Sequence, residues 1–217
     1  MKSSQHAPIV ALILATQAVS AWAKQETFTL DSAHTFPTFE VNHLGFSTQR
    51  GRFDQTRGKV VMDQQKKSGS VDIIIDANSI DTGVKPLDEV LRGVEFLNVE
   101  QYPTLSFHSS KLKFNGDQLA TVDGVVTMLG VSRPVTLTVT HYKCGVDPIT
   151  SKFVCGVDAE TTIRRSDYGM TRFLPLVNDE VKLKIQVEGT RDEEPAPRSG
   201  GFQQLFHADQ PLGEERR

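Results

Sequence analysis

Residues 181–188 read VKLKIQVE, and this alternation of apolar with charged or polar residues decides the fold class. Successive side chains of a β-strand point to opposite faces, so the stretch predicts a strand with one dry face and one wet face. The same period of two recurs in residues 135–140, 121–128 and 71–76, where Ile74 interrupts it. The chain is therefore expected to be all-β and antiparallel.

Turn-forming residues separate these strands, and one helical pattern interrupts them. Asn115-Gly116 is the clearest hairpin turn, because this pair favours the tight turns that join antiparallel strands. Pro86 opens the run PLDEVLRGVEFL, in which apolar residues recur at helical spacing. We expect a β-barrel of about eight strands with one short helix after the fourth strand region, since closure removes exposed sheet edges. A β-sandwich is the alternative.

Both ends of the chain differ from this strand-rich middle. Residues 1–23 combine Lys2, the apolar run APIVALILA and the small-x-small sequence Ala21-Trp22-Ala23, which predicts a cleaved export signal. A buried helix of the fold is the alternative. Residues 191–217 are rich in Pro, Gly and charge, which predicts a flexible C-terminal tail. The folded domain is then expected over residues 24–190.

Composition and motifs exclude several classes of function. The chain has 217 residues and 24 Lys+Arg against 27 Asp+Glu, so it lacks a basic field and no nucleic-acid partner is expected. It carries no nucleophile elbow, P-loop, dinucleotide-binding or zinc-protease motif. Its six His residues show none of the short spacings typical of metal ligands. We expect no catalytic residue, no metal and no cofactor.

The two cysteines predict a disulfide. Cys144 and Cys155 flank the turn signal of residues 147–150 in a chain expected to be exported. A hairpin centred on residues 149 and 150 sets the two sulfurs opposite each other. Strand parity places the cysteines on different faces unless a β-bulge intervenes, and Gly145 and Gly156 are natural places for one. Two free thiols are the alternative.

Five longer stretches carry a family resemblance. They are FEVNHLGFSTQRGRFDQTRGKVVMD (39–63), SIDTG (79–83), FLNVEQYPTLSF (96–107), GVVTMLGVSRPVTLTV (124–139) and IRRSDYGM (163–170). In this order and spacing they resemble the YceI-like family over nearly all of residues 27–190. The resemblance implies an exported, lipocalin-like barrel of extended strands, whose elongated apolar cavity holds a polyisoprenoid chain or a similar lipid. It also implies dimers, although no motif marks a dimer interface.

The inward-facing residues of such a barrel are the candidate ligand-binding site. His43 follows the alternation of Phe39 and Val41, so it either contacts a ligand or is a structural histidine bonded to neighbouring backbone. Arg165 also points inward by parity, where it meets a phosphate or quinone oxygen, or else pairs with Asp167 at the strand end. The residues expected to line the cavity are Phe39, Val41, His43, Phe46, Phe53, Ile73, Leu91, Phe107, Val126, Leu137, Ile163, Arg165, Tyr168 and Met170.

Three functions follow from these expectations. The first is periplasmic transport, storage or sequestration of an isoprenoid lipid, namely a polyprenyl chain, a prenyl phosphate or an isoprenoid quinone, with transient membrane contact and no catalytic cycle. The second is an enzyme that modifies a lipid, with His43 or Asp167 as acid or base. The third is a protein-interaction module of an envelope stress or redox system, which uses Phe202, Leu205 and Phe206 of the tail.

Overall fold

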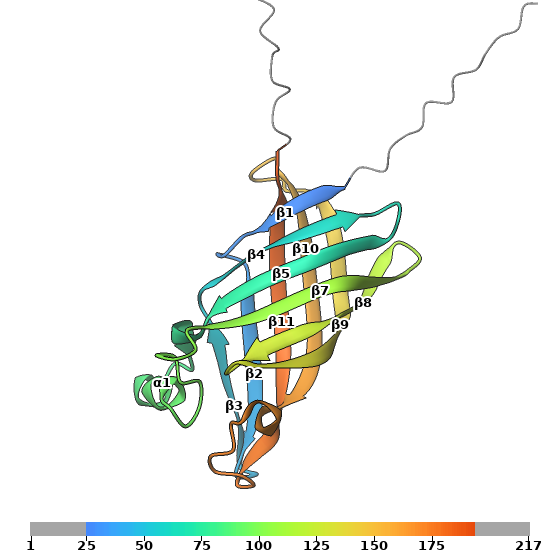
Figure 1. Ribbon diagram of the computed structural model, residues 1–217. Coiled ribbons are helices and arrows are strands. Elements are labelled where there is room, and N and C mark those ends of the chain that lie inside the picture. The colour runs from blue at the N-terminus through green and yellow to red at the C-terminus, as the bar shows by residue number, and fades with distance from the viewer. Residues whose placement is uncertain (1–24, 194–217) are drawn as a thin grey trace, which may run out of the picture.

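The computed structural model describes residues 25–193, so the expected export signal and nearly all of the expected tail lie outside the described residues. Eight antiparallel strands form a ring in the order β1-β4-β5-β7-β8-β9-β10-β11, which a β1–β11 pairing closes (Figure 1). The predicted eight-stranded barrel is confirmed. The strands are β1 (Glu26–Leu30), β2 (Phe36–His43), β3 (Ser47–Phe53), β4 (Thr56–Asp63), β5 (Ser68–Asp76), β6 (Ile80–Asp81), β7 (Thr104–Asn115), β8 (Gln118–Met128), β9 (Val131–Val146), β10 (Phe153–Arg164) and β11 (Val177–Arg191).

Three further strands extend the barrel at one end. The 15-residue β11 pairs with β1 through residues 189–191 and with β2 through residues 181–186. β1 and β2 therefore lie one after the other along the same edge of β11. β3 continues from β2, and the two-residue β6 pairs with β3. A strand interrupted in this way bends around a wider interior than a straight strand does.

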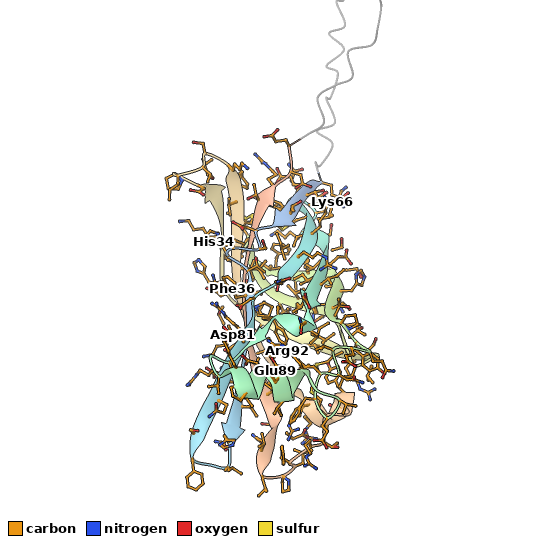
Figure 2. All side chains as sticks on the ribbon, turned by 90° about the vertical axis from the view of Figure 1, so that its left-hand side faces the viewer. His34, Phe36, Lys66, Asp81, Glu89 and Arg92 are labelled. Carbon is orange, nitrogen blue, oxygen red and sulfur yellow. A yellow bond between two sulfur atoms is a disulfide. The ribbon has the colours of Figure 1, made fainter. Side chains whose placement is uncertain are left out.

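The single α-helix, α1 (Lys85–Arg92), follows β6 and covers the side of this extension. Arg92, which lies with Glu89 on α1 (Figure 2), donates from Nε to the carbonyl of Asn78 and from Nη2 to the carbonyl of Ile80, both at 2.9 Å. The buried carboxylate of Asp88 accepts hydrogen bonds from the Thr82 backbone N–H and hydroxyl. These bonds fix α1 to the segment before it.

The hairpins follow the turn chemistry of the sequence. Asn115 pairs with Gln118 across a two-residue turn in which Gly116 has φ +60°, so the predicted hairpin is confirmed. Leu129 and Gly130 both have positive φ between Met128 and Val131, as a type I′ turn requires.

A disulfide joins Cys144 of β9 to Cys155 of β10, as predicted. The two residues are direct cross-strand partners. The predicted β-bulge also exists, but it does not lie at Gly145 or Gly156. The register shifts between Asp158 and Ala159, so the extra residue is Thr140 of β9. Its hydroxyl donates to the carbonyl of Asp158 at 3.2 Å, which compensates for the ladder bond that a bulge removes.

The two ends of the barrel differ in packing. We call the end with β1 and the β9–β10 hairpin the terminal end, and the end with α1 and the β2–β3 hairpin the helix end; they lie at the top and bottom of Figure 1. Side chains fill the terminal end. The buried residues there are Phe28, Leu30, Met62, Val71, Leu112, Leu119, Val122 and Cys155.

Candidate functional site

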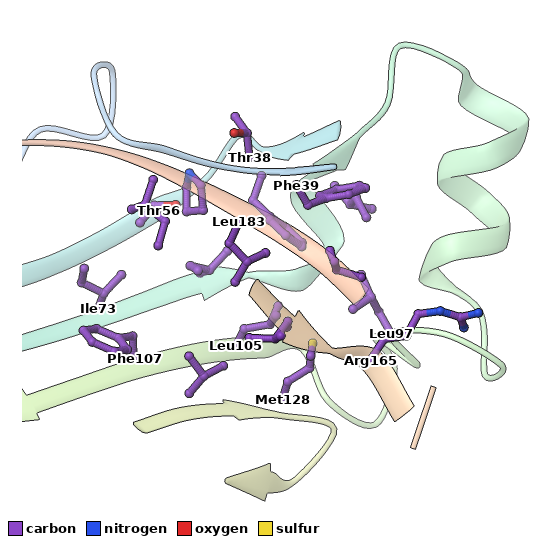
Figure 3. A pocket seen from close by; sticks show the side chains of 18 of the residues that line it. Thr38, Phe39, Thr56, Ile73, Leu97, Leu105, Phe107, Met128, Arg165 and Leu183 are labelled. Atoms are coloured by element: carbon purple, nitrogen blue, oxygen red, sulfur yellow. The ribbon is translucent and has the colours of Figure 1, made fainter. Parts of the chain in front are cut away.

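An elongated cavity runs inside the barrel toward the helix end. Its wall follows β11 from Val177 to Val187, and ten residue steps of a strand extend for about 30 Å. Figure 3 shows Ile73, Phe107 and Leu183 among the side chains that face this space. The cavity has an atom-free volume of about 1360 Å³ with its mouth included. Since 22 of its 27 lining residues are apolar, it suits a long apolar ligand.

Two glycines make room for aromatic residues of the cavity wall. Gly51 lies opposite Phe39 in the β2–β3 pair, and a Cβ atom at residue 51 would collide with the Phe39 ring. A Cβ atom at Gly124 would approach the Phe107 ring to 2.5 Å. Each ring therefore occupies space that a side chain at the glycine would otherwise take.

Most of the expected lining residues face this cavity. Eleven of the fourteen are on its wall, and their role in ligand binding stays a prediction. They are Phe39, Val41, Phe53, Ile73, Leu91, Phe107, Val126, Leu137, Ile163, Arg165 and Met170.

Three expected lining residues lie elsewhere. Phe46 is 89% exposed, because β2 ends at His43 and Phe46 follows the hairpin turn rather than the strand alternation. His43 keeps the parity of Val41 and pairs with Val177 and Ser47, but its side chain is not among those that line the cavity. Tyr168 is 2% exposed and packs in the core at the helix end, since it belongs to the 3₁₀ helix η2 (Arg165–Tyr168) and not to a strand.

Arg165 differs from both of its expected arrangements. The side chain is 4% exposed, and its guanidinium donates from Nε to Asn178, from Nη1 to Met170 and from Nη2 to Val177, in each case to the backbone carbonyl at 2.9–3.0 Å. Within residues 25–193 it makes no ion pair with Asp167. Figure 3 shows the guanidinium at the edge of the cavity and turned away from it. Arg165 therefore holds the segment before β11 in place, and burial lowers its pKa.

A carboxylate completes this support. Asp179 accepts hydrogen bonds from the Ser166 backbone N–H at 2.9 Å and from the Ser166 hydroxyl at 2.7 Å. These two bonds to the charged form lower the pKa of Asp179. Burial, followed by the negative charge of Asp167, raises the pKa of the neighbouring Tyr168. Arg165 and Asp179 thus hold the backbone at this end of the barrel in place, and they leave the cavity wall apolar.

Sequence reasoning missed part of the wall. Phe96 and Leu97 follow α1 and line the cavity, whereas Val94, which the helical spacing favours as a cover, is exposed. Leu183 and Val187 also line it. The alternation of residues 181–188 could have identified these two, because both belong to the dry face of that strand.

The expected acid and base residues lie off the cavity wall. Asp167 is exposed, and neither Asp167 nor His43 lines the cavity. The described part of the chain contains no group of three or more His, Cys, Asp or Glu residues arranged to hold a metal ion. None of the helices in residues 25–193 has the length and apolarity needed to cross a membrane.

Comparison with known proteins identifies the family. A family model described as the YceI-like domain matches residues 28–189, nearly the whole barrel. The chain belongs to the YceI-like family. A UPF0312 protein of Pseudomonas aeruginosa is 35% identical over 182 residues, which cover 83% of this chain and 93% of the relative. Protein YceI of Salmonella arizonae is 35% identical over 175 residues, which cover 80% and 91%.

Solved structures agree with the YceI-like barrel fold. BcnA of Burkholderia cenocepacia superposes with a TM-score of 0.62 and 24% identity, over 73% of this chain and 98% of its own. A polyisoprenoid binding domain of Saccharophagus degradans, implicated in plant cell wall breakdown, gives a TM-score of 0.58 and 16% identity over 76% and 98%. The resemblance to the YceI-like family inferred from the sequence is thereby confirmed.

Proposed function

We propose that the protein binds an isoprenoid lipid in its barrel cavity and transports, stores or sequesters that lipid in the periplasm. The observation that carries the proposal is the apolar wall from Val177 to Val187, which continues for about 30 Å without a charged residue other than Arg165 at its edge. A tube of this length favours a long chain over a compact metabolite. The polyisoprenoid binding domain of similar fold and the export signal expected in residues 1–23 support the ligand class and the location.

Hydrocarbon burial supplies the affinity in this proposal. Each buried methylene contributes about 0.8 kcal/mol, so several isoprene units bind tightly without directional contacts. The polar groups of the ligand then need few partners, and the length of the chain decides which lipid fits best.

Solvent extraction and mass spectrometry of the purified protein test this proposal. Val126 lines the cavity, whereas the adjacent Val125 is exposed on the outer face of β8. We expect lipid in wild type and Val125→Phe, and a shorter lipid or none in Val126→Phe, because the added ring occupies the cavity. The proposal would be contradicted if all three proteins contained no lipid after expression and took up neither an added quinone nor an added prenyl phosphate.

A further inference from the structure

Large apolar side chains are exposed at the extreme helix end of the barrel. Leu44 and Phe46 lie on the β2–β3 hairpin, and Phe173 and Leu176 lie on the segment between η2 and β11. We call these four residues the apolar tip. Both segments lie at the bottom of the barrel in Figure 1, and the Leu44 backbone N–H donates to the Leu176 carbonyl at 3.2 Å. Two segments far apart in sequence therefore present one apolar surface.

The backbone holds these side chains outward. Leu44 and Gly45 both have positive φ, and the Phe46 N–H donates to the His43 carbonyl at 3.0 Å, which is the geometry of a tight hairpin turn. A leucine is unfavourable at the first of these positions, where Asn, Asp or Gly is usual, and Phe173 also has positive φ.

The apolar tip is continuous with the cavity. Leu176 directly precedes Val177, which lines the cavity, and Val177 pairs with His43 beside Leu44. Phe173 also contacts the cavity residue Phe96, with ring centroids 6.3 Å apart. Apolar side chains therefore continue from the cavity wall to the outer surface at this end.

The two stretches that carry the apolar tip contain no acidic side chain that would repel a phosphate surface. Residues 41–53 and 168–178 contain no Asp or Glu, although the whole chain has 27 of them. Their charged residues are Arg50, Arg52 and Arg172, each of which pairs with an acid outside these two stretches. The Arg172 guanidinium also lies over the Phe173 ring, 4.6 Å from its centroid. Such a surface avoids repulsion by lipid phosphates, and aromatic residues beside arginine are favoured at membrane interfaces.

From these observations we propose that the apolar tip inserts into the interface of a phospholipid bilayer and brings the cavity to the membrane for lipid exchange. The inference rests on the proposed lipid-binding function and adds to it the surface through which lipid enters. The membrane is the partner, since the apolar side chains at the tip of two loops are too few to bury the area that a stable protein dimer requires.

Sedimentation with vesicles of phosphatidylethanolamine and phosphatidylglycerol, three to one, tests the proposal on the full chain. The test variant is Phe46→Ser with Leu176→Ser, at side chains that are 89% and 65% exposed. The matched control is Val146→Ser with Ile149→Ser at the terminal end, where the side chains are 67% and 91% exposed. We expect the vesicle partition coefficient of the test variant to fall about tenfold or more, and that of the control to equal wild type.

Three outcomes would overturn the proposal: no binding of wild type to vesicles, equal losses in the test and control variants, or a change of oligomeric state without a change in vesicle binding. The last result would assign the apolar tip to an interface between two copies of the chain. Lipid content, measured by solvent extraction of the same proteins, separates this test from that of the proposed function. Bound lipid without vesicle binding overturns only the membrane contact, whereas vesicle binding by a protein that never holds lipid overturns the lipid-binding function.

Discussion

The terminal end and the helix end belong to one continuous sheet, yet one is filled and the other is hollow. Leu112 and Val122 occupy the interior at the terminal end, where the disulfide also joins β9 to β10. Toward the helix end, Leu183, Met128 and Leu91 of α1 face a cavity. The comparison indicates that the terminal end stabilises the barrel, so that the helix end can remain open for a ligand.

Matched leucine substitutions test this division most strongly. We expect Leu112→Ala to lower the free energy of unfolding by about 3 kcal/mol, because it creates a cavity in a packed core. Leu183→Ala should cost about 1 kcal/mol, since Leu183 already faces empty space and its removal mainly loses part of the buried apolar area. Urea denaturation of the ligand-free proteins measures both. Equal losses would show that the two ends are packed alike.

Removal of the disulfide should have a comparable effect on the stability of the terminal end. Cys144 and Cys155 are 11 residues apart, and opening a loop of this size costs about 3 kcal/mol in the chain-entropy model. We expect the double substitution Cys144→Ala and Cys155→Ala to reduce stability by this amount and to leave lipid binding unchanged. Urea denaturation and solvent extraction of the same variant give the two measurements. Loss of lipid at full stability would contradict the division between the ends.

At the helix end, a smaller and pH-dependent effect is expected from Asp179. Its pKa is lowered from the ordinary value of 3.8, so it stabilises the folded state above that value and ceases to do so as the pH falls through the lowered pKa. Asp179→Asn should therefore cost about 1 kcal/mol at pH 6, and this cost should shrink as the pH falls through the lowered pKa. Denaturation curves at pH 6 and at a series of lower pH values test this sign. Asp167→Asn, in the 3₁₀ helix that contains Ser166, is the control, because that exposed side chain has no hydrogen bond among residues 25–193.

Much of the barrel could be predicted from its alternating strands and its hairpin turns. The alternation in residues 71–76 and 121–128 placed Ile73 and Val126 on the cavity wall, because the period of a strand is fixed by its geometry. Parity does not reveal where a strand passes the end of a cavity, which is why His43 and Phe46 were misplaced. Arg165 escaped prediction for a different reason. Its partners are backbone carbonyls, and the positions of carbonyl groups depend on a tertiary arrangement that residue identities do not encode.

The central claim is that the helix end is a hollow for an isoprenoid chain. A binding titration with prenyl alcohols of increasing length tests this claim most directly. Geraniol, farnesol, geranylgeraniol and longer homologues differ only in the number of isoprene units. We predict that the dissociation constant falls about tenfold or more with each added unit until the chain fills about 30 Å, and then becomes constant. A dissociation constant independent of chain length, or no binding at any length, would contradict the account.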